Sequence, residues 1–226
     1  MASDRQAEQG SGLGRVRDRL GTGVLTDALT RLGLDGWMDG VLPMRPDALV
    51  IGPAATVRCA PRRGTDTLGK TMYELIRGCR PGDVLVIEAN GARSSVFGGN
   101  MARCGDVQGL AAMITDGRCR DWGDSCGLRM AVFCRGPTVR LPADLEIVAC
   151  NVPVSCGNAQ VHPGDLIVAD VDGVVVVPQS RIEAVLYEVE ELLELEAELG
   201  RIIDSQGPVA DIEAVLRRKK TRRAQS

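Results

Sequence analysis

Two short segments of the chain carry groups that could act together on a small anionic molecule. The first is the run Gly98-Gly99-Asn100-Met101, and the second is the pair Arg120-Asp121, one strand and one turn later. Paired glycines let the backbone approach a ligand closely, and a helix beginning there exposes N–H groups that favour a carboxylate or phosphate. Arginine binds carboxylates through two hydrogen bonds, and aspartate is a hard oxygen ligand for Mg²⁺ or Mn²⁺. These segments could hold a small carboxylate substrate beside a metal ion.

Each segment also has a simpler structural interpretation. Glycine pairs are common turns before helices, and an Arg-Asp pair can be a surface salt bridge combined with a helix cap. Asp124 follows Asp121 closely enough to share a face with it if a helical turn forms there. The glycine run is neither a phosphate loop of the Gly-x-x-x-x-Gly-Lys type nor a dinucleotide fingerprint.

Other side chains that could perform acid–base chemistry are few. The single histidine, His162, precedes Pro163-Gly164 and is interpreted as a turn residue, so no Ser-His-Asp or Cys-His arrangement is expected. Proton transfer would then fall to carboxylates or to bound water. The glutamates of the long C-terminal helix are first a solvated face, although one of them could reach a neighbouring subunit's site.

The chain has eight cysteines, and none of them forms a Cys-x-x-Cys pair. Structural zinc sites usually take their ligands from closely spaced pairs, so the pattern predicts reduced thiols that act as small buried hydrophobes. Cys119 lies between Arg118 and Arg120, and it is the thiol whose neighbours could lower its pKa.

Charge and composition exclude several classes of partner. A net charge of −3 gives no general attraction to nucleic acids or anionic membranes, and an aromatic content of 3% argues against recognition of bases by stacking. The basic run from Arg217 to Arg223 is interpreted as the cationic end of a solvated helix, in preference to a nucleic-acid tether. Because the chain has neither a long apolar span nor an apolar leader, we expect a soluble, cytoplasmic protein.

The hydrophobic pattern predicts an α/β domain with a mixed sheet that would position these groups. Strands are expected over 49–59, with an interruption at Pro53, and over 84–89, 110–115, 131–134, 145–151, 166–170 and 174–177. Helices are expected over 22–32, 67–79 and 181–203, from the Gly98-Gly99 turn to about Gln108, and again after Pro208. The predicted organisation is a disordered tail over 1–14, a domain over 15–205, and a C-terminal helix with a basic tail over 206–226. Turns of the form Pro-Gly-Asp precede two of the strands, at 81–83 and 163–165.

Five motifs in this order resemble the RraA-like family over about residues 20–200. They are Thr26-Asp27-Ala28-Leu29, Gly52-Pro53-Ala54-Ala55-Thr56-Val57, Gly98-Gly99-Asn100-Met101-Ala102, Asp116-Gly117-Arg118-Cys119-Arg120-Asp121, and the stretch from Pro163-Gly164-Asp165 to Val177-Pro178. This family includes 4-hydroxy-4-methyl-2-oxoglutarate/4-carboxy-4-hydroxy-2-oxoadipate aldolases and the regulator of ribonuclease activity A. The resemblance implies a swivelling β/β/α-type domain with a mixed sheet. It also implies a homo-oligomer, either a trimer or a dimer of trimers, with sites between subunits.

The resemblance also implies roles for individual residues. The family pattern Asp-x20-Arg-Asp would make Asp121 the direct ligand of Mg²⁺ or Mn²⁺, and Arg120 the residue that binds and polarises a pyruvoyl group. Backbone N–H groups around Asn100 and Met101 would hold the substrate carboxylate, with Gly98 and Gly99 allowing its approach. Glu196 would be the glutamate contributed by an adjacent subunit. The leading Asp of the pattern falls on Gly99, so part of the proton-handling network is expected to be absent.

The expected activity is therefore that of a divalent-metal-dependent lyase that cleaves a carbon–carbon bond of a small α-keto acid through a pyruvate enolate. Such an enzyme would be a 4-hydroxy-2-oxo acid aldolase, an oxaloacetate decarboxylase, or both. The alternative is a non-catalytic regulator of the same family that binds a ribonuclease or another protein. A third possibility is an enzyme of another pathway with the same chemistry, in which Arg93, Arg103 and Arg118 suit a more anionic substrate.

Overall fold

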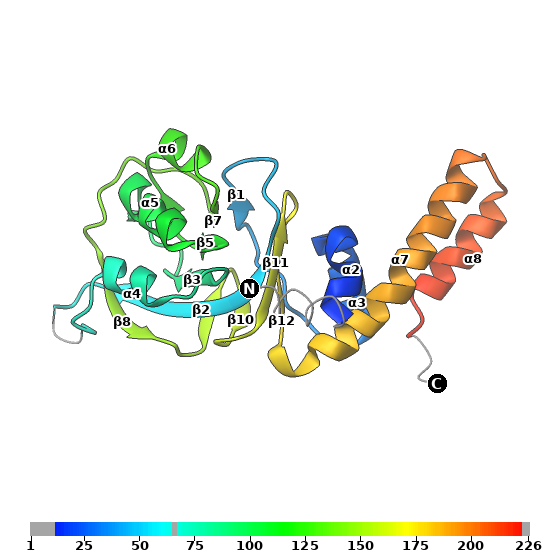
Figure 1. Ribbon diagram of the computed structural model, residues 1–226, viewed down its shortest axis with the longest axis horizontal. Helices are drawn as coiled ribbons and strands as arrows, with labels where there is room; N and C mark the ends of the chain where they lie inside the picture. Colours follow the sequence, from blue (N-terminus) through cyan, green and yellow to red (C-terminus); the bar gives the residue numbers. More distant parts are fainter. Residues whose placement is uncertain (1–11, 65–66, 223–226) are drawn as a thin grey trace. The chain divides into compact units, whose positions relative to one another are not determined.

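The computed structural model describes residues 12–64 and 67–222, and the chain forms two compact units (Figure 1). Described residues 12–35 and 180–222 make a helical unit, and residues 36–179 make a unit that contains all the strands. The predicted boundaries near residues 14 and 205 do not separate these units, because helices from both ends of the chain pack together. The predicted tail begins in residues 1–11, outside the described residues, and residues 12–14 belong to a helix.

The unit formed by residues 36–179, called the β unit below, contains both strands and helices as far as α6 and strands alone after it. Its strands are β1 (Leu42–Pro43), β2 (Val50–Pro61), β3 (Val84–Glu88), β4 (Ser95–Phe97), β5 (Ala112–Thr115), β6 (Arg118–Cys119), β7 (Ala131–Cys134), β8 (Leu145–Cys150), β9 (Val154–Cys156), β10 (Ala159–Val161), β11 (Leu166–Asp170) and β12 (Gly173–Val177). Its helices are α4 (Met72–Gly78), α5 (Gly99–Gln108) and α6 (Trp122–Cys126).

The main sheet is mixed, as the sequence predicts. Its strand order is β1-β7-β5-β3-β2-β11-β12, with β8 also paired to β2. Strands β2, β3, β5 and β7 are parallel neighbours, while β1, β8, β11 and β12 join antiparallel. Parallel strands buried on both faces are continuous apolar runs, and every residue of β3, β5 and β7 is buried. The expected interruption at Pro53 is wrong, because β2 continues through it and pairs Pro53 with Leu166 of β11.

Helix α4 is shorter than the range 67–79 that its apolar spacing predicts. The Thr71 side chain accepts a hydrogen bond from the Glu74 backbone N–H, and the Glu74 carboxylate accepts one from the Thr71 backbone N–H. This reciprocal capping box fixes the start of the helix at Met72. Helix α4 packs beside α5, and Ile76 of α4 and Ala102 of α5 are fully buried in the same core cluster.

The two Pro-Gly-Asp turns have the same local structure. Both Gly82 and Gly164 have φ of +89°, a conformation that suits glycine. In each turn the Asp carboxylate accepts a hydrogen bond of 2.7 Å from the backbone N–H three residues earlier, Asp83 from Arg80 and Asp165 from His162. His162 therefore takes part in this turn through its backbone.

The helical unit is built from both ends of the chain. It contains α2 (Gly12–Val16), the 3-10 turn η1 (Arg17–Arg19), α3 (Thr22–Arg31), α7 (Ile182–Asp204) and α8 (Val209–Lys219), and the 3-10 turn η2 (Gln179–Arg181) leads into it. The predicted helices at 22–32, at 181–203 and after Pro208 are confirmed. Helix α7 buries the apolar face formed by Val185, Val189 and Leu192. None of the described helices is both long and apolar enough to cross a membrane.

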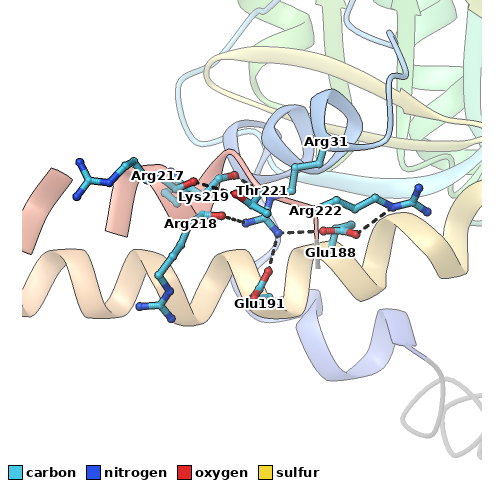
Figure 2. Close-up of polar contacts among 8 residues, drawn as sticks. All are labelled: Arg31, Glu188, Glu191, Arg217, Arg218, Lys219, Thr221 and Arg222. Atoms are coloured by element: carbon cyan, nitrogen blue, oxygen red, sulfur yellow. Dashed lines mark hydrogen bonds and ion pairs between the residues drawn. The ribbon is translucent and has the colours of Figure 1, made fainter. Parts of the chain in front are cut away.

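A buried arginine joins three helices of this unit (Figure 2). The side chain of Arg31, at the end of α3, is 2% exposed. It donates hydrogen bonds of 2.9 Å to Glu188 and 2.7 Å to Glu191 on α7. Two further bonds, of 2.9 and 2.7 Å, reach the backbone carbonyls of Arg218 and Lys219 at the end of α8. Arg31 therefore caps α8 and neutralises acidic groups of α7 at the same time.

The described part of the basic run pairs with acidic residues of this unit. Lys219 forms an ion pair with Asp27 at 3.0 Å and another with Glu196, and Arg218 lies 2.9 Å from Glu198. Arg222 lies 3.7 Å from Glu188 (Figure 2). These cations therefore hold α8 against α7 and α3, beyond the expected complement to the helix dipole. Arg223 lies outside the described residues.

Candidate active site

The glycine run and the Arg-Asp pair lie side by side because the strands before them are paired. Strands β4 and β6 are parallel, with Phe97 opposite Cys119, so both strands end at the same place. The backbone N–H of Arg120 donates to the carbonyl of Phe97 at 3.2 Å. Helix α5 begins at Gly99 directly after β4, and α6 begins directly after Asp121. The structure thus brings together the two segments that the sequence singles out.

Asp121 does not cap its own helix. Its backbone has φ of +58°, a left-handed conformation that aspartate tolerates better than most residues. Its side chain makes no capping bond to α6, and its Oδ2 instead accepts a hydrogen bond of 3.0 Å from the backbone N–H of Gly99. Arg120 Nε lies 3.6 Å from the same oxygen. The carboxylate therefore connects the first turn of α5 with the guanidinium.

There is little space for a side chain at either glycine beside this carboxylate. A Cβ on Gly98 would lie 2.5 Å from Asp121 Oδ2 and 2.8 Å from Arg120 Cγ. A Cβ on Gly99 would lie 3.1 Å from Oδ2 of Asp124 and 3.2 Å from Cβ of Asp121. The backbone at Gly98 is extended, so any residue could adopt its conformation. Contact with the Arg-Asp pair therefore decides that residue 98 is glycine.

Several groups at this site remain open to a ligand. The side chains of Arg120 and Asp121 are 35% and 43% exposed. Within the described residues, the backbone N–H of Asn100 has no partner, whereas that of Met101 donates to the Gly98 carbonyl at 3.1 Å. A small carboxylate could therefore receive hydrogen bonds from the Asn100 N–H and from the guanidinium of Arg120.

The donor set suits a hydrated hard cation. Asp121 and Asp124 both supply carboxylate oxygens beside Gly99. Among residues 12–64 and 67–222, no group of three or more His, Cys, Asp or Glu side chains could surround a metal ion. Mg²⁺ is commonly held by one or two carboxylates and keeps several water or substrate oxygens in its octahedral shell.

The expectation for Cys119 is wrong, because its side chain is 1% exposed. Burial, together with the neighbouring thiol of Cys134, raises the pKa of Cys119 well above its usual value, although Arg118 and Arg120 are adjacent in sequence. The hydrogen bond with Cys119 instead lowers the pKa of Cys134 to about 7, against the opposing effect of burial. The sequence could not reveal this pairing, since the two thiols lie on β6 and at the end of β7.

A second pair of acidic groups lies at the carboxyl ends of β3 and β5. Glu88 accepts hydrogen bonds from Arg58 at 3.1 Å and from the backbone of Ser155 at 3.2 Å. Burial raises the pKa of Asp116, although the 2.7 Å hydrogen bond from the Ala89 backbone opposes that shift. Sequence reasoning assigned neither residue a role. These hydrogen bonds explain both as structural groups, because Glu88 connects β2 with β9 and Asp116 holds the backbone that follows β3.

The remaining predicted residues are placed as follows. Asp124 lies in the first turn of α6, next to Gly99. Arg103 follows Asn100 along α5, and both line a surface hollow of about 310 Å³ with Arg77 of α4. Glu196 belongs to the helical unit, where it is paired with Lys219 of its own chain.

Residues 22–176 match the RraA-like family, described as Aldolase/RraA. The chain belongs to this family. A protein of Halalkalibacterium halodurans named "Putative 4-hydroxy-4-methyl-2-oxoglutarate aldolase" is 38% identical over 166 residues, which cover 73% of this chain and 76% of that protein. A Burkholderia mallei protein of the same name is 29% identical over 133 residues, covering 58% of this chain and 77% of that protein.

Two solved structures have the same fold as this member of the family. RraAS2 of Streptomyces coelicolor, described as an unusual member of the RNase ES inhibitor RraA protein family, superposes with a TM-score of 0.76 at 30% identity. That superposition covers 83% of this chain and 96% of RraAS2. A Pseudomonas syringae protein superposes with a TM-score of 0.77 at 26% identity, covering 89% of this chain and 96% of that one. The mixed-sheet fold implied by the sequence motifs is confirmed.

Proposed function

We propose that this family member is a divalent-metal-dependent lyase that cleaves a carbon–carbon bond of a small α-keto acid through a pyruvate enolate. The observation that carries the proposal is the contact of Asp121 with the first turn of α5. Through this contact the Asp121 carboxylate and the Arg120 guanidinium lie beside Gly98 and Gly99, next to the free backbone N–H of Asn100. The aldolase names of its relatives in Halalkalibacterium and Burkholderia support the same reaction type.

The residues of this chain would bind and orient the keto acid. The N–H of Asn100, at the positive end of the α5 dipole, suits the substrate carboxylate. The guanidinium of Arg120 is free to donate to the carbonyl oxygen, where negative charge accumulates as the enolate forms. Asp121 would hold Mg²⁺ or Mn²⁺, which when bound withdraws electrons from the substrate carbonyl. The 3.0 Å hydrogen bond from Gly99 keeps that carboxylate beside the substrate site.

Two reactions share this enolate and differ in their need for a base. Retro-aldol cleavage of a 4-hydroxy-2-oxo acid requires loss of the C4 hydroxyl proton, whereas decarboxylation of oxaloacetate does not. Residue 99 is glycine where the family pattern has Asp. If that carboxylate serves only proton transfer, Gly99→Asp should increase the ratio of aldol cleavage to decarboxylation when both are measured at saturating metal. Equal changes in both rates would contradict this distinction.

The proposal is tested by release of pyruvate, followed by oxidation of NADH in the presence of lactate dehydrogenase. Oxaloacetate and 4-hydroxy-4-methyl-2-oxoglutarate are offered in turn with Mg²⁺ or Mn²⁺, with and without a chelator, and spontaneous decarboxylation is subtracted. We expect metal-dependent pyruvate from at least one substrate, abolished in Asp121→Ala. Pyruvate release that is equal with and without the protein, for both substrates, would refute the lyase.

A site between subunits is part of this proposal. We expect a trimer or a dimer of trimers, which sedimentation equilibrium distinguishes by mass. Glu196 is proposed to act on a neighbouring subunit's site, yet in its own chain it pairs with Lys219. Glu196→Gln separates these roles, because loss of activity with unchanged mass and melting temperature supports a contribution to the neighbouring site. Full activity of Glu196→Gln would show that the pair with Lys219 is its whole role.

The alternative function is that of a regulator that binds another protein. It is supported by the structural likeness to RraAS2, which is described as belonging to a family of RNase inhibitors. A fold shared by enzymes and inhibitors does not by itself select between them. Binding of a ribonuclease E-type enzyme that persists in Asp121→Ala, with no pyruvate release by the wild type, would favour the regulator.

A further inference from the structure

We propose that Asp124 is a positioning residue of this site, and that it supplies from α6 the second carboxylate that residue 99 does not supply from α5. This inference rests on the proposed lyase function. In this arrangement Asp121 and Asp124 together would hold a hydrated divalent cation.

The Asp124 side chain fills the space beside Gly99. A Cβ built on this residue lies 3.1 Å from both Cβ and Oδ2 of Asp124. Real Cβ atoms are rarely so close to a neighbour, so the Asp124 side chain occupies the room that a side chain at position 99 would need. The same Cβ lies 3.2 Å from Cβ of Asp121. Gly99 and Asp124 therefore compete for the same space, and a side chain at position 99 requires the Asp124 side chain to move.

The carboxylate of Asp124 is available to a ligand. Among residues 12–64 and 67–222 it has no hydrogen-bond or ion-pair partner. It is the third residue of the five-residue helix α6, which begins at Trp122. Asp121, by contrast, has one oxygen committed to the Gly99 N–H and to the guanidinium of Arg120. Asp124 thus retains both oxygens for water or for a cation.

The negative charges of Asp121 and Asp124 favour a cation between the two carboxylates. Two carboxylates beside one glycine repel each other unless positive charge lies between them, and Arg120 contacts only Asp121. A hydrated Mg²⁺ or Mn²⁺ would reduce this repulsion, and Asp124 could accept hydrogen bonds from its water ligands. The purely structural interpretation is a negative charge at the start of α6 that favours the helix dipole. That interpretation predicts a change in stability and no change in cation affinity.

The first experiment measures Mn²⁺ binding by electron paramagnetic resonance of the free ion, without substrate. We expect Asp124→Asn to weaken binding by about 10-fold, as outer-shell partners of metals commonly do, with an unchanged melting temperature. Asp124→Glu should recover much of the affinity because it restores the carboxylate. Asp47→Asn is the matched control, since Asp47 is a 77% exposed aspartate of the same unit that pairs with Arg45. Unchanged affinity in Asp124→Asn, or an equal loss in Asp47→Asn, would overturn the inference.

The second experiment exchanges the two residues. Gly99→Asp alone crowds two carboxylates into one space, and Asp124→Gly alone removes the second carboxylate, so both variants should bind Mn²⁺ more weakly. The double variant Gly99→Asp/Asp124→Gly again has two carboxylates at the site, and of the three nearest contacts of the new Cβ it keeps only the one at 3.2 Å with Cβ of Asp121. We expect its affinity to return to within about threefold of the wild type, a non-additive effect typical of residues in contact. A double variant no better than the weaker single variant would contradict the exchange.

These outcomes remain separable from failure of the proposed reaction. Wild-type protein that binds Mn²⁺ through Asp121 and Asp124 but releases no pyruvate refutes the lyase and supports the role of Asp124. Pyruvate release that is unaffected by Asp124→Asn, together with normal Mn²⁺ affinity, supports the lyase and refutes the role of Asp124. Wild-type protein that does not bind Mn²⁺ overturns this inference directly.

Discussion

The guanidinium groups of Arg31 and Arg120 belong to the two different units and are used in opposite ways. Arg31 is 2% exposed and makes four hydrogen bonds, two to carboxylates and two to helix-terminal carbonyls. Arg120 is 35% exposed, and its side chain lies 3.6 Å from one carboxylate. An arginine has five N–H donors, so Arg31 has almost none left for a ligand, whereas Arg120 has most of its donors free.

This difference indicates that Arg31 stabilises the fold and that Arg120 is available for binding. A buried charge is tolerated only when its donors are satisfied, and a satisfied network resists change because breaking it leaves the other charge buried. A partly exposed charge with unused donors adds little to stability and remains available to bind. We therefore expect substitutions in the Arg31 network to affect folding and those around Arg120 to affect activity.

The largest expected effect is on folding, from Arg31→Met. Methionine keeps much of the volume but removes the hydrogen bonds from Arg31 to two carboxylates of α7 and to the end of α8, which should lower the free energy of unfolding by about 3–5 kcal/mol. Chemical denaturation measures this loss. Arg15→Met is the control, because Arg15 is 58% exposed in its 2.8 Å pair with Glu190 and should cost less than about 1 kcal/mol. Equal losses in the two variants would show that burial of the charge does not matter here.

The next effect is on catalysis, from Asp121→Asn. Asparagine tolerates the left-handed backbone at φ of +58° and can still accept the hydrogen bond from Gly99. The fold should therefore remain, with a melting temperature close to that of the wild type. Loss of the anionic ligand should lower kcat/KM for pyruvate release by about 10²–10³-fold. A loss of stability comparable to that of Arg31→Met would instead show that Asp121 mainly stabilises the fold.

Smaller losses of both stability and activity are expected from Gly98→Ala. The added methyl group would lie 2.5 Å from Asp121 Oδ2, so the carboxylate and Arg120 must move. We expect a loss of about 1–3 kcal/mol in the free energy of unfolding and a clear loss of activity. Gly123→Ala in α6 is the matched control, because nothing lies within 4 Å of its new Cβ. That control should be neutral or more stable by up to about 1 kcal/mol, since alanine favours helix.

The smallest expected effect is a loss of stability of the helical unit at alkaline pH, caused by deprotonation of Lys219. Burial alone lowers the pKa of Lys219, but hydrogen bonds with Glu196 and Asp27 outweigh it and raise the pKa above its usual 10.5. A raised lysine pKa means that its stabilising contribution is complete below pH 10.5 and is lost as the pH rises through the folded-state pKa. Thermal melts above pH 10.5 should show a decrease of less than about 1 kcal/mol. In Lys219→Met that decrease should be absent, and an identical alkaline profile would exclude Lys219 as its cause.

Much of the fold follows from local sequence signals. Apolar spacing predicts α3 and α7, continuous apolar runs predict β3 and β5, and Pro208 precedes α8 as a helix-start signal should. The errors have local physical causes as well. The capping box at Thr71 shortens α4, and Pro53 is accommodated within β2. The thiol of Cys119 is governed by burial and by Cys134, which no neighbour in sequence reveals.

The sequence by itself determined that a glycine run opens a helix, that an Arg-Asp pair follows the next strand, and that the chain is RraA-like, because short-range patterns carry this information. Only the tertiary structure decided that Asp121 turns to the N–H of Gly99, and that Asp124 occupies the space beside the same glycine. It also decided that Arg31, on a helix near one end of the chain, caps a helix near the other. The physical reason is that hydrogen-bond satisfaction and excluded volume act between residues that meet only in the folded chain.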